Sequence, residues 1–159
     1  MGRIALSLAA GTALLVGGTA HAQTFVYEVT WEPVESIGGL TTGPGGRRYG
    51  GGVVEGTYTT TNEDGSTVTG TVKCVGMDQP DGGVFAIHLT CDYSDQSGGG
   101  SIVYGCNFQG EPGPNTPLGC IGGFEAKSGE FSGRAGNLTM DWYSASQSSG
   151  TGQWYRSGG

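Results

Sequence analysis

The stretch from residue 118 to residue 143, LGCIGGFEAKSGEFSGRAGNLTMDWY, decides the fold. Its first half alternates apolar side chains with polar residues or glycine. A polar turn follows at residues 127–129, and the return half alternates again up to the pair Trp142-Tyr143. Such alternation is typical of a β-strand with one buried face, so the stretch predicts an antiparallel hairpin. It carries no catalytic signature.

The same alternation recurs upstream and predicts further strands at residues 25–31, 53–61, 66–75, 84–93 and 101–108. Pro33 is expected to end the first of these, and a short closing strand carries Trp154. The glycines at 98–100 and the proline-rich loop 111–117 mark reversals of the chain. Seven or eight short strands joined by short links predict an all-β fold, a small antiparallel up-and-down barrel. A β-sandwich is the alternative.

The first 22 residues have the pattern of a secretory signal peptide. Arg3 precedes an apolar run from Ile4 to Val16, and Ala20-His21-Ala22 forms a small-x-small cleavage site. The apolar run is shorter than the roughly 20 residues needed to span a bilayer. We therefore expect residues 23–159 to form a single β-barrel domain that is periplasmic or secreted, with no membrane span.

Composition narrows the possible partners. Without residues 1–22 the chain has six basic and fourteen acidic side chains, a net charge of −8. An acidic surface disfavours nucleic acid as a partner. The 34 glycines follow no collagen-like period, so with the frequent Ser and Thr they indicate a turn-rich β domain.

The four cysteines are expected to form two disulfides. They lie on the apolar faces of four consecutive predicted strands, at about the same height. A disulfide spans at most about 7 Å between Cα atoms, which reaches a neighbouring strand but not the next one. This predicts the pairs Cys74–Cys91 and Cys106–Cys120. No Cys-x-x-Cys motif is present and only one histidine follows residue 22, so no metal site is expected.

The apolar faces collect most of the aromatic side chains, including Phe25, Phe85, Tyr93 and Phe124, and no charged residue of the predicted strands. An eight-stranded barrel either fills its interior with its own side chains or holds one small ligand. Tyr and Trp offer ring faces and polar tips to such a ligand. The candidate ligand-binding residues are Tyr27, Trp31, Tyr58, Tyr104, Phe108 and Trp142.

No group of catalytic residues is recognisable, and no cofactor is expected. The alternation places His88 on the solvent face. Arg134 and Asp141 lie near the ends of the last strands, where they could form a surface ion pair at the end of the barrel.

The segment GEFSGRAGN at residues 129–137 resembles the glycine-punctuated closing hairpin of the allene oxide cyclase and dirigent barrels. The resemblance covers residues 119–143. It implies an eight-stranded barrel whose lumen binds hydrophobic molecules and guides cyclisation or radical coupling without a cofactor. That family has ionisable groups inside the barrel, and its pattern does not include the four cysteines.

Three functions follow from these observations. The first is a barrel that binds a small apolar or aromatic molecule in its lumen. The second is a structural or envelope protein that acts through a surface such as the glycine-rich loop 34–51, with Arg47 and Arg48. The third is a cofactor-free cyclase or isomerase that uses the same lumen.

Overall fold

The computed structural model describes residues 23–41, 48–79, 83–113 and 115–155. The predicted signal peptide and Arg47 lie outside these ranges. The described chain forms eight strands: β1 (Thr24–Thr41), β2 (Arg48–Asn62), β3 (Thr67–Asp78), β4 (Ile87–Asp95), β5 (Gly98–Phe108), β6 (Leu118–Gly129), β7 (Ala135–Ser144) and β8 (Gln147–Trp154). No helix in these ranges is long and apolar enough to cross a membrane.

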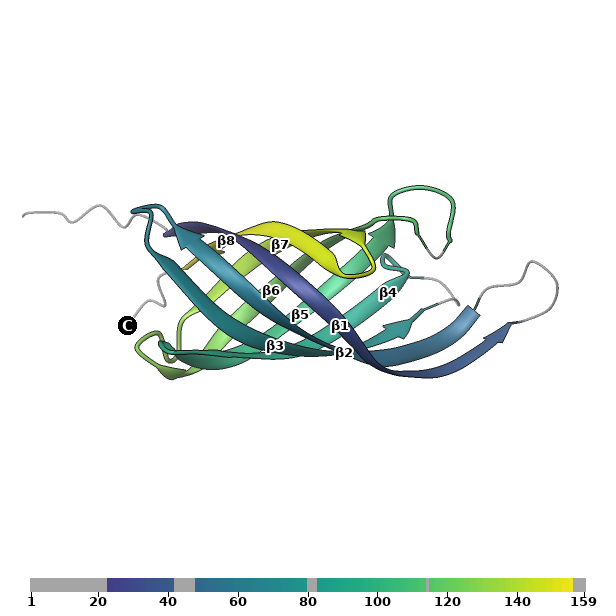
Figure 1. Ribbon diagram of the computed structural model, residues 1–159, viewed down its shortest axis with the longest axis horizontal. Coiled ribbons are helices and arrows are strands. Elements are labelled where there is room, and N and C mark those ends of the chain that lie inside the picture. The colour runs from purple at the N-terminus through teal and green to yellow at the C-terminus, as the bar shows by residue number, and fades with distance from the viewer. Residues whose placement is uncertain (1–22, 42–47, 80–82, 114, 156–159) are drawn as a thin grey trace, which may run out of the picture.

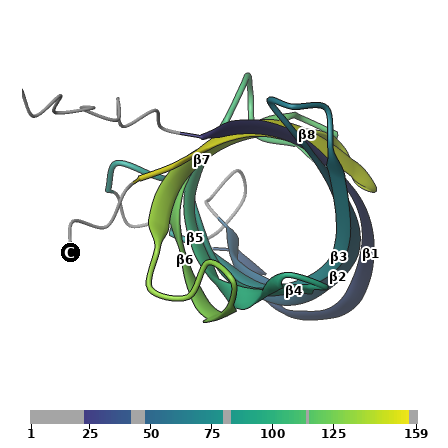
Figure 2. The same ribbon diagram turned by 90° about the vertical axis from the view of Figure 1, so that its left-hand side faces the viewer.

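The strands form a closed antiparallel barrel in sequence order (Figures 1 and 2). The closing contact pairs β1 with β8, from Thr24 opposite Gln153 to Thr30 opposite Gln147. The predicted up-and-down barrel is confirmed with eight strands, and the sandwich alternative is wrong. Side chains alternate between the inner and outer faces, as the hydrophobic pattern predicts.

The first hairpin is longer than predicted. Pro33 does not end β1 but pairs with Val54 at a register shift, and β1 continues to Thr41 beside β2. Pairing with β8 stops at Thr30, so beyond that point β1 is an edge strand. Proline is tolerated at edges and bulges because its missing N–H then breaks no ladder bond. The β1–β2 hairpin therefore projects beyond the rest of the barrel (Figure 1).

The glycines at 98–100 are not the turn between β4 and β5, as the sequence predicts, but lie within β5. Asp95 pairs with Gly98, so the turn is at residues 96 and 97. Gly100 lies opposite Tyr93, and a Cβ there would come 2.7 Å from the Tyr93 ring. These glycines thus make room for a side chain and for β6, which explains why they are inside a strand.

This shorter turn changes the relative height of the cysteines. Cys91 pairs with Ile102, and Cys106 pairs with Ile87. The expectation that all four cysteines share one height is therefore wrong, and the two cystines lie at different levels of the barrel. Both predicted disulfides nevertheless form, Cys74–Cys91 and Cys106–Cys120, between directly paired residues with Cα atoms 4.0 and 4.1 Å apart.

Two other boundaries differ from the prediction. The turn between β6 and β7 follows Gly129, because β6 continues through residues 127–129. β4 begins at Ile87 rather than at Val84, so Phe85 is not on its inner face. The Phe85 ring packs outside the barrel against Gly105, where a Cβ would come within 2.2 Å of the ring, and beside His88.

The interior is filled at one end only. The buried cystines, Met140 and the stacked rings of Trp31 and Trp142 pack the half of the barrel nearer the β3–β4 and β5–β6 loops. The opposite half, where the β2–β3, β4–β5 and β6–β7 turns lie, is hollow. We call this hollow end the mouth.

We expect loss of either disulfide to lower the unfolding free energy by about 3 kcal/mol, because each closes a short loop, of sequence separation 17 or 14, in the unfolded chain. Urea unfolding of Cys74→Ala/Cys91→Ala and of Cys106→Ala/Cys120→Ala measures this loss. The control is Val75→Ala/Thr90→Ala, a directly paired couple on the outer face of β3 and β4. An equal loss in the control would contradict the expectation.

Candidate functional site: a lumen cavity at the mouth

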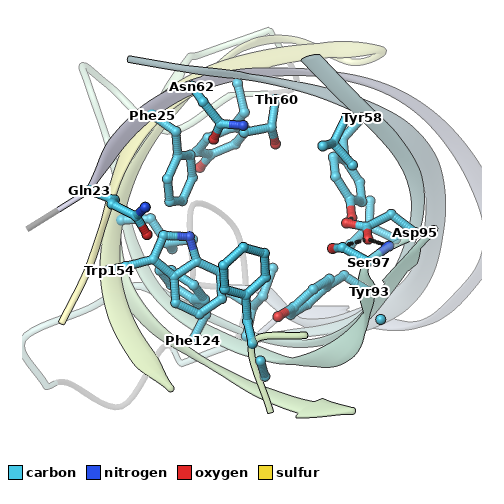
Figure 3. A pocket seen from close by; sticks show the side chains of 18 of the residues that line it. Gln23, Phe25, Tyr58, Thr60, Asn62, Tyr93, Asp95, Ser97, Phe124 and Trp154 are labelled. Carbon is cyan, nitrogen blue, oxygen red and sulfur yellow. Dashed lines mark hydrogen bonds between the residues drawn. The ribbon is translucent and has the colours of Figure 1, made fainter. Parts of the chain in front are cut away.

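A cavity of about 430 Å³ occupies the lumen at the mouth. Its walls come from all eight strands, and Figure 3 looks into it. Phe25, Phe124 and Trp154 gather on one side, whereas Tyr58, Tyr93 and Asp95 lie on the other (Figure 3). The site therefore has an apolar wall that faces a wall carrying polar groups.

The cavity stays open because inward rings lie over inward glycines of the neighbouring strand. Each of six aromatic residues is directly paired with a glycine, and a Cβ at that glycine would come within 3 Å of the ring or its hydroxyl. The pairs are Phe25 with Gly152, Tyr27 with Gly150, Tyr58 with Gly70, Tyr93 with Gly100, Tyr104 with Gly122, and Phe124 with Gly136. The glycines give the rings space against the wall, so the rings do not fill the centre.

The apolar wall is a cluster of rings in contact. The Phe124 ring meets the Trp154 ring edge-on with centroids 4.4 Å apart, and it meets the Phe25 ring in the same way at 5.7 Å. Phe131 stacks on Trp154 at 5.1 Å, and the Arg134 guanidinium lies 5.2 Å from the centroids of both rings. Such contacts hold large side chains in fixed positions.

Asp95 is the centre of the polar wall. Its Oδ2 accepts a hydrogen bond of 2.5 Å from the Tyr58 hydroxyl, and its Oδ1 accepts bonds from the Ser97 backbone N–H (2.7 Å) and hydroxyl (2.5 Å). Burial raises the pKa of Tyr58, and the bond to Asp95 adds to the effect. Burial, with the nearby Asp95 charge, raises the pKa of Tyr93 to about 12. Both tyrosines are therefore neutral at ordinary pH.

The expectation of an interior without charged groups is wrong at Asp95. The alternation that places Cys91 and Tyr93 inside continues by one more step, because β4 extends to Asp95 rather than ending at Tyr93. The carboxylate lines the cavity. The alternation of inward and outward residues contains this signal, but the predicted strand 84–93 ends two residues before Asp95.

Two tyrosines at the deep end of the cavity share a hydrogen bond. The Tyr27 hydroxyl donates to the Thr139 carbonyl at 2.7 Å and lies 2.9 Å from the Tyr104 hydroxyl. Because the carbonyl can only accept, Tyr104 is the donor in the second bond. Burial raises the pKa of Tyr104 to about 12 and raises that of Tyr27 further.

Four of the six candidate ligand-binding residues line the cavity: Tyr27, Trp31, Tyr58 and Tyr104. Trp142 stacks behind Trp31, and Phe108 lies at the far end of β5, where it pairs with Leu118. Neither of these two lines the cavity. Phe25, Phe124 and Trp154 also point inward by the alternation of side chains, and they line the cavity. The alternation alone does not say which end of the barrel is hollow.

The polar residues near the strand ends do not form the predicted ion pair. Arg134 precedes β7 and donates to the Gln23 side chain at 3.1 Å, whereas Asp141 accepts from Gln109 at 2.7 Å near the other end of the same strand. His88 is exposed, as predicted. Within the described ranges, no group of three or more His, Cys, Asp or Glu side chains could hold a metal ion.

Comparison with protein-family models, with curated proteins and with solved structures finds no match for the chain. The likeness to the allene oxide cyclase and dirigent barrels therefore stays a prediction.

Ser148→Ala tests the packing beneath the cavity. Ser148 is fully buried, and its hydroxyl accepts a 2.8 Å bond from the Trp31 indole N–H. An unpartnered buried donor costs about 1–3 kcal/mol, so we expect that loss in unfolding free energy from urea titration. Ser149→Ala, on the outer face one residue along β8, is the control and should change stability by much less. Similar values for the two variants would contradict the role of this bond.

The buried tyrosines predict a loss of stability in alkali. Below pH ~10 they are protonated in both the folded and the unfolded chain. Burial raises the pKa of Tyr104 to about 12 in the folded chain. Between pH ~10 and that value, only the unfolded chain loses the Tyr104 hydroxyl proton, so the unfolding free energy falls as pH rises. Urea unfolding across this range, compared between wild type and Tyr104→Phe, isolates the contribution. Parallel curves for the two proteins would count against it.

Proposed function

We propose that this protein binds a small apolar or aromatic molecule in the lumen of its barrel. The observation that carries the proposal is the cavity of about 430 Å³ at the mouth, bounded by Phe25, Phe124, Trp154 and the tyrosines. Ligand pockets have volumes of about 300–1,000 Å³ and mostly apolar walls with a few polar groups. A barrel that only packed its own core would not leave such a space.

The rigidity of the site also supports the proposal. The strands form a closed sheet, two disulfides cross-link neighbouring strands, and ring–ring contacts fix the apolar wall. Every buried side-chain nitrogen or oxygen among the described residues has a hydrogen-bond partner. A preformed site loses little conformational entropy when a ligand enters, so more of the burial energy, about 25 cal/mol per Å² of apolar surface, contributes to affinity.

The arrangement fits binding better than proton-transfer catalysis. An acid or base works best with a pKa near the operating pH. Here burial moves the pKa values of Tyr58, Tyr93 and Tyr104 away from that range. The Asp95 carboxylate already accepts three hydrogen bonds from its own wall. The hydroxyls and the carboxylate are suited to orienting a ligand.

Gly152→Ala tests the lumen directly. The three atoms nearest to a Cβ at this position all belong to the Phe25 ring, the closest at 2.1 Å, so the methyl group should push that ring into the cavity. We expect weaker binding of N-phenylnaphthylamine, an uncharged dye that fluoresces in apolar sites. We also expect a loss of about 1–3 kcal/mol in stability from overpacking.

The matched control is Gly123→Ala, where a Cβ would meet only the Gly136 carbonyl oxygen at an ordinary 3.5 Å. This variant should bind the dye as wild type does. Circular dichroism confirms that both variants remain folded. Absence of dye binding to the wild type, or equal binding by the two variants, would overturn the proposal.

A further inference from the structure

The charged side chains that line the cavity are all acidic. Asp95 lies on the polar wall, and Glu63 and Asp64 lie in the β2–β3 turn at the mouth. Glu63 accepts a hydrogen bond from Thr24. Hydrogen bonds from the Ser66 hydroxyl and N–H hold the pKa of Asp64 below its usual value. Three carboxylates around one opening create a negative potential, which attracts cations and repels anions.

Asp95 can accept a further bond inside the cavity. A carboxylate has about four acceptor positions, and the contacts with Tyr58 and Ser97 use three of them. Within the described residues, no lysine or arginine forms an ion pair with Asp95. Its negative charge is thus held in place by neutral donors but is not neutralised by a cation.

The rings beside Asp95 favour a cation as well. Tyr58 and Tyr93 meet edge to face with centroids 6.5 Å apart, and both line the cavity next to the carboxylate (Figure 3). A cation gains energy over such ring faces. Arg134 shows the same preference at this mouth, where its guanidinium lies over Phe131 and Trp154. That guanidinium is bonded to Gln23 and does not line the cavity.

We propose that the ligand of this lumen is a hydrophobic amine. Its ammonium group binds at Asp95 between Tyr58 and Tyr93, and its apolar body lies against Phe25, Phe124 and Trp154 on the opposite wall. This assignment rests on the proposed function and adds the charge and orientation of the bound molecule. An amine donates two or three hydrogen bonds, and charge-assisted bonds to a carboxylate are about twice as strong as neutral ones.

The test uses three molecules that differ only in their head group: naphthylmethylamine, naphthylmethanol and naphthoate. Each is titrated against the protein with bound N-phenylnaphthylamine, and displacement of the dye gives its affinity. We expect the amine to bind about tenfold more tightly than the alcohol, as one charge-assisted bond would give, and the carboxylate to bind weakest.

Asp95→Asn should remove the preference for the amine and leave the affinity for the alcohol nearly unchanged. Asparagine retains the Oδ1 that accepts both bonds from Ser97, so the β4–β5 turn is expected to stay intact. The melting temperature of the Asp95→Asn variant checks that the turn is intact. Glu28→Gln is the matched control, because it removes one negative charge from the exposed outer face of β1. This variant should keep the preference.

The outcomes separate the two proposals. If the dye does not bind, both the lumen site and the amine assignment fall. If the dye binds but the amine and the alcohol displace it equally, only the amine assignment falls. Tighter binding of the carboxylate would also overturn it and would direct attention to Arg134. A preference that survives in Asp95→Asn would show that Asp95 does not hold the ammonium.

Discussion

The pairing of β1 with β8 is the constraint on which the rest of the structure depends. Seven residue pairs, from Thr24–Gln153 to Thr30–Gln147, turn an eight-stranded sheet into a closed tube. Closure gives every inward side chain a surrounding wall, and it removes the open edges that a Thr-rich sheet would otherwise expose. The β1–β2 hairpin extends past the region where β1 pairs with β8, and there Pro33 and a register shift interrupt the regular ladder.

Within this tube, the pairing of rings with glycines decides whether the interior is full or hollow. The inner face carries enough aromatic side chains to fill a narrow barrel. Six of these rings instead lie over glycines on the next strand, for example Phe25 over Gly152. Each ring thus occupies the space that a side chain on the neighbouring strand would take, and space remains at the centre of the barrel. Glycine is common in this chain partly because the inner wall needs it, and not only because the turns do.

The alternation of side chains along each strand predicted which residues face inward, because the side-chain direction in a strand is a local property. It placed Tyr27, Tyr58, Tyr104 and the cysteines on the inner face correctly, and the rule that only neighbouring strands can be bridged predicted both disulfides. The register between neighbouring strands was harder to predict, because it depends on the position of each turn. If the glycines at 98–100 formed the turn, Cys106 would lie level with Cys91, but these glycines belong to β5, where Gly100 lies beneath the Tyr93 ring.

The same limitation applies to the residues that line the cavity. Asp95 is the last residue of β4, and its inward direction follows from parity only if the strand is known to reach it. Phe85 is the opposite case, since it has the right parity but precedes the first residue of the strand. The ends of strands are set by turn geometry and by pairing with distant segments, which one short stretch of sequence does not contain.

The position of Asp95 at a strand end also explains how one charge can be held inside an apolar tube. Its Oδ1 accepts the Ser97 bonds that shape the β4–β5 turn, so the carboxylate belongs to the turn as much as to the wall. The hydrogen bonds from Ser97 and Tyr58 offset part of the cost of removing the carboxylate from water, and its position at the mouth keeps it near solvent. A charge deeper in the lumen would have the cystines, Met140 and the Trp31–Trp142 stack as neighbours. The hydroxyls of Tyr27 and Tyr104 and the indole N–H of Trp31 already donate hydrogen bonds to other groups there. The mouth is thus the part of the barrel where a polar contact and an apolar wall can face each other across one cavity.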